Sequence, residues 1–286
     1  MLPTFVIGLR EGVEASLIVG IIAAFLRQEG RRDLLRNVWM GVGLAAAICL
    51  AVGIALDVLN SQLPQRQQEM LETVVGVLAV GVVSFMVFWM TRHARGMRKE
   101  LEASAATALA TGSAAALVGM AFFAVLREGL ETAVFLLAIF QDASDPAAAG
   151  LGAVLGLALA VLIGVGIYRG GIKLDLARFF RLTSVVLVMV AAGLLASAAG
   201  TAWEAGWITG FQSQPLDLSW LVVPGTWTSS LLTGMLGLQP HPSVAQITVY
   251  LAYALPMGLY VLWPRGRSTK RARSTSTRTA GARSTA

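Results

Sequence analysis

The sequence Arg127-Glu128-Gly129-Leu130-Glu131 places three charged residues in the middle of a long apolar segment. The same pattern, Arg10-Glu11-Gly12-Val13-Glu14, interrupts the apolar run at the N-terminus. A charged side chain at the centre of a bilayer costs about 2.5–3.5 kcal/mol on insertion scales, so such groups persist where they pair, bind an ion or face water. If these segments cross a membrane, the two strings mark a functional site.

The composition of the whole chain is typical of a membrane protein. Of its 286 residues, 56% are hydrophobic and 13% are charged, whereas soluble domains carry about 25% charged residues. The formal net charge is +6, but the basic residues are spread over short loops and a tail, so we predict no nucleic-acid binding. The single cysteine, Cys49, excludes a disulfide framework and a thiolate metal site.

Seven apolar segments are long enough to cross a bilayer. We predict transmembrane helices over residues 3–26, 38–59, 70–91, 107–140, 148–168, 182–203 and 244–263. The fold class is therefore an all-α integral membrane protein, with a single seven-helix domain over residues 1–263.

Two further segments do not fit a spanning helix. The stretch 218–238 is apolar, but Pro224, Gly225 and several Ser and Thr favour a re-entrant or interfacial segment. Residues 264–286 are rich in Arg, Ser and Thr and are predicted to form a disordered basic cytoplasmic tail.

The basic residues predict the orientation. The first, third and fifth loops carry four Lys or Arg each and the tail carries seven, whereas the alternate loops contain only Arg66. Because cytoplasmic loops carry the excess of basic residues, the N-terminus is predicted outside and the C-terminus inside.

The two charged strings also occupy matching places in the chain. Spans one to three and spans four to six form two triplets of opposite orientation, and each triplet begins with the helix that carries the Arg-Glu-Gly-x-Glu string. We therefore predict two inverted three-helix repeats plus a seventh helix, an arrangement that places substrate sites near the membrane midplane.

The motif spacing brings carboxylates together. Side chains three or four positions apart share a helix face, so Glu11 neighbours Glu14 and Glu128 neighbours Glu131. Antiparallel packing of the two helices would place these four carboxylates in one layer, together with the arginines Arg10 and Arg127. Gly12 and Gly129, beside the carboxylates, would let these two helices approach closely.

Oxygen ligands favour hard cations, whereas Cys, Met and His favour softer copper or zinc. The predicted layer contains no histidine, and we expect Cys49 to lie elsewhere. Ferric iron, magnesium, calcium and manganese all fit this ligand set. A structural alternative is that each Arg–Glu pair only fixes helix register, but one pair needs one glutamate and each motif has two.

Acidic residues also lie at the predicted outer ends of the spans. Glu69, Glu72 and Glu204 are candidates for an outer entrance site, although acids at a solvated helix terminus are an equally simple interpretation for the first two. Asp142 and Asp145 are predicted to lie in a solvated turn.

The doubled string resembles the oxidase-dependent iron transporter family, which includes the fungal high-affinity iron permease and the bacterial Efe-type ferrous iron permease. The similarity extends over about residues 1–263 and includes Phe88-Trp89-Met90 and Trp203-Glu204-Ala205-Gly206-Trp207. This resemblance implies an iron permease and not an enzyme, and the Ala-, Gly- and Arg-rich composition favours a bacterial source, so we expect it in the bacterial plasma (inner) membrane. The implied iron ligands are Glu11, Glu14, Glu128 and Glu131, accompanied by Arg10 and Arg127.

The resemblance also implies partners. A partner oxidises Fe(II) to Fe(III) before transport: a multicopper oxidase in fungi, and a set of periplasmic proteins that includes a haem peroxidase in bacteria. We expect such an extracytoplasmic oxidase or peroxidase and an iron-delivery protein here. No permanently bound cofactor is expected, only the transported Fe3+ or Fe2+ ion.

Other functions remain open from the residues alone. Transport of another divalent metal, such as lead or manganese, would use the same ligands. An intramembrane hydrolase could use glutamate pairs as general bases, but such enzymes commonly add His or Asn, and none lies near this layer. A structural subunit would not require a doubled motif.

Overall fold

The computed structural model describes residues 1–93, 96, 103, 107, 114–141, 143, 145–169, 175–207, 210, 213–220, 222, 226, 232–233 and 239–263. These ranges contain the helices α1 (Leu2–Gln28), α2 (Asp33–Gln62), α3 (Gln65–His93), α5 (Ala114–Gln141), α6 (Pro146–Tyr168), α7 (Leu176–Glu204) and α9 (Val244–Leu262). Each predicted span coincides with one of these helices. The predicted tail, Asp142, most of 218–238 and most of 107–113 lie outside the described residues.

Five of the described helices, α2, α3, α6, α7 and α9, are long and apolar enough to cross a membrane. The other two, α1 and α5, are 27 and 28 residues long. Every stretch of 18 residues in them contains at least three charged residues, because the motifs lie near their centres. The chain is thus a multi-pass membrane protein, and its two motif helices are distinguished from the rest by charge and not by length.

Local sequence fixes where several helices begin and end. Asp145 caps α6, since its side chain accepts a hydrogen bond from the Ala148 amide at 3.0 Å. Ser243 and Gln246 form a capping box at the start of α9. The α1–α2 turn contains Gly30 at a φ of +73°, a conformation that side-chain-bearing residues rarely adopt. Asp145 therefore has a structural role in the predicted turn.

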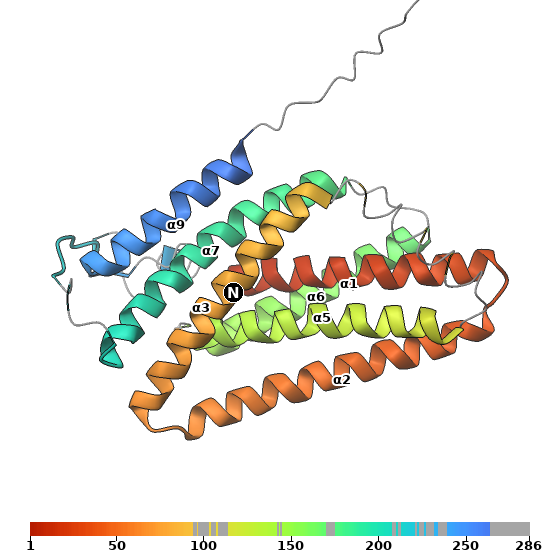
Figure 1. The fold of residues 1–286 in the computed structure, drawn as a ribbon, viewed down its shortest axis with the longest axis horizontal. Helices are drawn as coiled ribbons and strands as arrows, with labels where there is room; N and C mark the ends of the chain where they lie inside the picture. The colour runs from red at the N-terminus through yellow and green to blue at the C-terminus, as the bar shows by residue number, and fades with distance from the viewer. Residues whose placement is uncertain are drawn as a thin grey trace, which may run out of the picture.

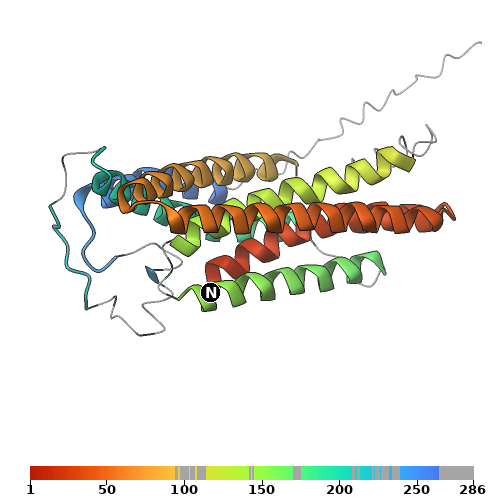
Figure 2. The same cartoon turned by 90° about the horizontal axis from the view of Figure 1, so that it is seen from below.

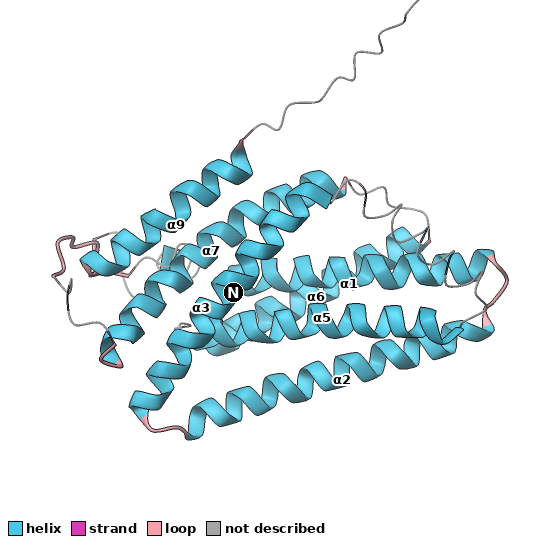
Figure 3. Ribbon diagram, viewed as in Figure 1, coloured by secondary structure: helices cyan, strands magenta, loops and turns pink. Residues whose placement is uncertain are grey.

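The helices lie in two groups (Figure 1). α1, α2, α5 and α6 run along the long axis of the molecule, while α3, α7 and α9 cross beside them at an angle. In the view from below, α2 and α6 lie apart from each other, with α1 between them (Figure 2). Successive helices run in opposite directions and loops are confined to the two ends (Figure 3). The charged motifs therefore lie on antiparallel helices, as predicted.

The main pairings of the helices do not change when the triplet α1–α3 is exchanged for the triplet α5–α7. The contact between α1 and α6 corresponds to that between α5 and α2, and the contact between α1 and α7 corresponds to that between α5 and α3. The contacts between α1 and α5 and between α3 and α7 map onto themselves, and the contact between α1 and α2 corresponds to that between α5 and α6. Helix α9 breaks the equivalence, because it packs mainly against α7 and little against α3. The two motif helices thus occupy equivalent central positions.

The α1–α6 interface depends on glycine. A Cβ atom at Gly8 would lie 2.8 Å from the Ala153 carbonyl oxygen, and one at Gly156 would overlap the Phe5 carbonyl oxygen. A Cβ at Gly164 would lie 2.6 Å from the Ser16 Cβ. Because lipid is as apolar as a leucine side chain, helices in a bilayer associate through this kind of close van der Waals contact. The glycines of α6 therefore hold α1 in place.

The role predicted for Gly12 and Gly129 was wrong. Gly12 faces Ala160 and Leu157 of α6, and Gly129 faces Cys49 of α2. Neither glycine lies between α1 and α5. Each motif glycine lets its helix approach the outer neighbour, and the side of the helix that meets the other motif helix carries the glutamates instead.

Replacing Gly156 with alanine tests this packing. We expect Gly156→Ala to destabilise the protein by about 1–3 kcal/mol, since the added methyl group meets backbone atoms of α1 that cannot move alone. The unfolding temperature of the detergent-purified protein measures the effect. Gly150→Ala is the matched control on the same helix, because no atom lies within 4 Å of its added Cβ. Equal stability of the two variants would contradict the argument.

Candidate functional site

The motif of α1 is almost completely buried. Arg10 is 0% exposed, Glu11 1% and Glu14 5%. The Arg10 Nε atom lies 3.4 Å from the Glu14 Oε1 atom, one helical turn away, so the predicted pairing within this motif is confirmed. No hydrogen bond is made by any of the three guanidinium nitrogens. The charge of Arg10 is thus balanced by a single, rather long ion pair.

The motif of α5 is more open. The Arg127 Nε atom donates to Glu131 Oε1 at 2.9 Å and lies 3.8 Å from Glu128 Oε1. Half of the Arg127 side chain is exposed, and its guanidinium carbon lies 5.9 Å from the centre of the Trp89 ring. The two motifs share a sequence pattern and an i, i+4 ion pair, but their arginines lie in different surroundings.

Three carboxylates from the two motif helices converge. Oxygen atoms of Glu11, Glu128 and Glu131 lie within 4.8 Å of one another, close enough to bind one metal ion. Glu14, the fourth predicted ligand, is not in this set and pairs with Arg10 instead. The structure therefore brings together three of the four predicted carboxylates as a candidate metal site.

These carboxylates have unused acceptor atoms. Both oxygens of Glu11 are buried without a hydrogen-bond partner, and so is one oxygen each of Glu128 and Glu131. Isolated buried carboxylates are strongly unfavourable unless a proton or a cation neutralises them. Carboxylate oxygens are ligands for hard cations. The cluster is thus built to take up positive charge.

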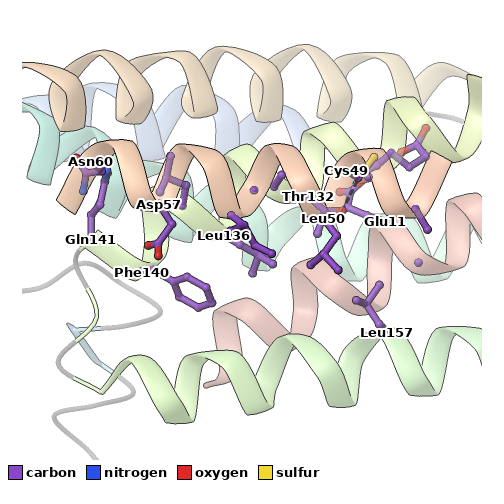
Figure 4. Close-up of a pocket in the computed structure, with 18 of the residues that line it drawn as sticks. Glu11, Cys49, Leu50, Asp57, Asn60, Thr132, Leu136, Phe140, Gln141 and Leu157 are labelled. Carbon is purple, nitrogen blue, oxygen red and sulfur yellow. Dashed lines mark hydrogen bonds between the residues drawn. The ribbon is translucent and has the colours of Figure 1, made fainter. Parts of the chain in front are cut away.

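A cavity of about 910 Å3 leads to the cluster (Figure 4). Its deep end is formed by Glu11 and Glu128 beside Gly12 and Gly129. Its other end reaches Asn60 near the end of α2 and Gln141 at the end of α5. These ends are 11 residues apart along α2, from Cys49 to Asn60, which corresponds to about 16 Å. The cavity connects the carboxylate cluster with the end of the bundle that holds the α2–α3 and α5–α6 links.

The expectation that Cys49 lies elsewhere was wrong. Cys49 lines the deep end of the cavity, and its thiol lies 3.5 Å from the Leu126 carbonyl oxygen on the motif helix α5. Its sulfur is not among the atoms that converge within 4.8 Å. The thiol is therefore a neighbour of the candidate site and not one of its ligands.

The cavity wall also contains polar residues that the sequence did not single out: Asp57, Asn60, Gln68 and Gln141. They lie in the last turns of α2 and α5 and in the first turn of α3, where polar residues are common at the ends of spanning helices. The signal that could have revealed them is their spacing, since Asp57 and Asn60 are three residues apart and directly follow the long apolar stretch of α2.

The predicted entrance residues are not brought together. Glu72 lines the cavity, but Glu69 and Glu204 do not. Glu69 accepts a hydrogen bond from Gln65 at 3.1 Å, and Glu204 is exposed at the last position of α7. Of the three residues, only Glu72 is placed to meet an ion inside the cavity.

A multi-pass helical protein with a cluster of buried carboxylates, several of whose oxygen atoms have no hydrogen-bond partner, at the base of a polar-mouthed cavity has the architecture of a membrane transporter for cations. The comparison with known proteins gives the family. Residues 1–265 match the iron permease FTR1 family, and the chain belongs to it.

Its relatives are bacterial permeases. The ferrous iron permease EfeU of Yersinia pestis is 42% identical over 93% of this chain and 95% of its own length. The protein of the same name from Yersinia pseudotuberculosis is 43% identical, covering 91% and 92%. That of an Escherichia coli strain is 42% identical, covering 94% and 98%. No solved structure matches. The resemblance inferred from the motifs is thus confirmed, and these relatives are transporters and not enzymes.

The different surroundings of the two arginines predict different effects on stability. Arg10→Gln should destabilise by about 3–5 kcal/mol, because it leaves a buried Glu14 without its partner. Arg127→Gln should cost less than Arg10→Gln, because half of the Arg127 side chain is exposed and solvent screens its charge, although the side chains of its partners Glu128 and Glu131 are only 6% and 17% exposed. Unfolding temperatures of the purified variants compare the two, and a greater loss for Arg127→Gln would overturn this ranking.

Proposed function

We propose that this protein moves iron inward across the bacterial plasma (inner) membrane, with Glu11, Glu128 and Glu131 as the central ligands. The observation that carries the proposal is the set of buried carboxylate oxygens without partners at the base of the cavity. The geometry supports a hard cation, and the relatives that are named ferrous iron permeases support iron as that cation.

We further propose that all seven described helices span the membrane, with the N-terminus outside and the C-terminus inside. Supporting this, the successive helices run in opposite directions (Figure 1), and the loops at one end carry the excess of basic residues. The exchangeable pairing of the triplets supports an inverted repeat. In this orientation the mouth of the cavity faces outward, because the α2–α3 and α5–α6 links lie on the outer side.

The inner side of the site is closed. An apolar cluster from α1, α2 and α5 lies between the motifs and the α1–α2 turn, and its buried members are Ile22, Leu26, Leu34, Val38, Leu117 and Ala121. A hydrated ion cannot pass through this apolar cluster, and an ion stripped of its hydration shell would find no ligands there. Transport therefore requires the triplets to rearrange so that the outer mouth closes and this cluster separates, which is alternating access about a central site.

The motif ion pairs explain how the site is stable both without a metal ion and with one bound. When no metal is bound, Arg127 is positioned to compensate Glu131 and partly Glu128. A metal ion bound by Glu11, Glu128 and Glu131 would take over part of this role, and the ion pair would reform after release. Glu14 stays neutralised by Arg10 throughout, so it serves as a support to the ligand cluster.

We propose that a delivery protein brings iron to the mouth of the cavity as Fe(II), that an extracytoplasmic oxidase or peroxidase removes one electron from it there and passes this electron to its own oxidant, dioxygen or peroxide, and that the ion then passes the motifs as Fe(III). Three carboxylates match a trivalent ion well, since the charge of −3 that they carry when ionised balances the charge of +3 on Fe(III). Iron is the cargo in this scheme, and no permanent cofactor takes part.

Replacing one ligand glutamate with glutamine should strongly reduce iron transport. Glu11→Gln and Glu128→Gln retain side-chain size, so we expect folded protein with iron uptake reduced at least 10-fold. Uptake of radioactive iron into proteoliposomes measures this, with manganese and lead as competitors to test selectivity. Glu29→Gln is the control, because Glu29 is exposed beyond the end of α1. Wild-type uptake by both ligand variants would refute the proposed path.

The natural Cys49 reports which side the cavity faces. As the only cysteine in the chain, it should react with a membrane-impermeant cationic thiosulfonate applied to the outer face of spheroplasts, and not in inside-out vesicles. Mass spectrometry of the protein gives the labelled fraction.

Gly53→Cys in a Cys49→Ser background provides a second reporter, since Gly53 lines the cavity nearer its mouth and has room for a side chain. Cys49→Ser alone is the unlabelled control. Reaction from the inner face only would show that the proposed orientation is reversed.

A further inference from the structure

We propose that the mouth of the cavity holds a second cation site, formed by Asp57, Asn60 and Glu72 with Gln141 beside them. This site would bind hydrated ferrous iron before the ion reaches the glutamate cluster. The proposal rests on the proposed iron transport, and it adds a ligand set that the motifs do not contain.

The residues come from three helices that meet at the mouth. Asp57 and Asn60 lie one turn apart near the end of α2, Glu72 lies in the second turn of α3, and Gln141 is the last residue of α5. Figure 4 shows Asn60, Gln141 and Asp57 at the same end of the cavity, away from Glu11. Two carboxylates and two amides thus border one space.

Asn60 provides the independent sign of a ligand. It is only 8% exposed, and its Oδ1 atom is buried without a hydrogen-bond partner. An amide oxygen left in this way costs about 1–3 kcal/mol, a cost that a cation or its water removes. Asparagine oxygens are common ligands of hard divalent cations. The Nε2 atom of Gln141 is likewise buried without a partner, and a water in the outer shell of the ion would satisfy it.

The charge of the wall selects a cation. Four acidic residues line the cavity, namely Glu11, Asp57, Glu72 and Glu128, and no basic residue is found among the described residues of its wall. A cleft lined by one sign of charge concentrates ions of the opposite sign. An anion or a neutral solute would gain nothing from this arrangement.

The second site is separate from the first. Gln141 is 13 residues from Glu128 along α5, which corresponds to about 20 Å. The wall between them is largely apolar, with Leu50, Ile54 and Leu136. A hydrated ion entering from outside would therefore be held at the polar mouth and would then cross an apolar stretch to the glutamate cluster. Two successive sites let an ion bind firmly enough to enter and still move on.

The test uses binding and transport together. Equilibrium binding of radioactive Fe(II), kept reduced without oxygen, should give two ions per purified wild-type chain. The double variant Asp57→Asn/Glu72→Gln should bind one ion, and Glu11→Gln/Glu128→Gln should bind one ion at the other site. In proteoliposomes, we expect the mouth variant to raise the KM for iron at least 10-fold with an unchanged maximal rate.

Two further variants guard against a folding defect. Asn60→Asp adds a charge at the same position and should tighten binding of the outer ion at least several-fold. Glu69→Gln is the matched control, because Glu69 lies one turn earlier on α3 and outside the cavity wall, and it should leave binding and KM unchanged. Unfolding temperatures confirm that each variant is folded.

The outcomes separate the two proposals. One bound ion in the wild type, or a mouth variant indistinguishable from Glu69→Gln in both binding and KM, would overturn the second site. Absence of uptake by the wild type of iron supplied both as Fe(II) and as Fe(III) would overturn the proposed function instead, while the count of bound ions would still report on the mouth.

Discussion

The site depends on the burial of one carboxylate, Glu11, whose two oxygen atoms have no hydrogen-bond partner. Glu11 is 1% exposed and neither of its oxygens accepts a hydrogen bond. Such a group is stable in an apolar surrounding only when positive charge or a proton reaches it. The helices around it provide a cavity through which a cation can arrive. The metal site and the cavity that leads to it therefore both follow from the need to neutralise the buried carboxylate of Glu11.

The packing explains how the carboxylates can meet. Glycines on α6 bring α1 close to that helix, and Gly129 brings α5 close to Cys49 of α2. Each motif helix is thus fixed from its outer side by small residues. The glutamates of α1 and α5 are left to face one another, so close packing on one side of each helix creates the ion site on the other.

The two motifs are alike in sequence and different in surroundings. In α1 the arginine is buried and neutralises Glu14, whereas in α5 the half-exposed arginine contacts Glu131 and Glu128. This difference matches a state that is open on one side only. In the inverted-repeat transporter proposed above, the two triplets must differ at any moment for the path to be open to one side and closed to the other.

The sequence by itself determined the helices, the class and the family, because a bilayer requires long apolar segments and each charged residue within them is conspicuous. It also determined the i, i+4 ion pairs, which follow from helix geometry alone. The tertiary structure decided which glutamates converge, that Glu14 is set apart, that Cys49 lies at the site and that Asp57 and Asn60 border the cavity. These features depend on how far each helix is rotated about its axis. That rotation is set by close contacts between helices distant in the sequence, which no local pattern records.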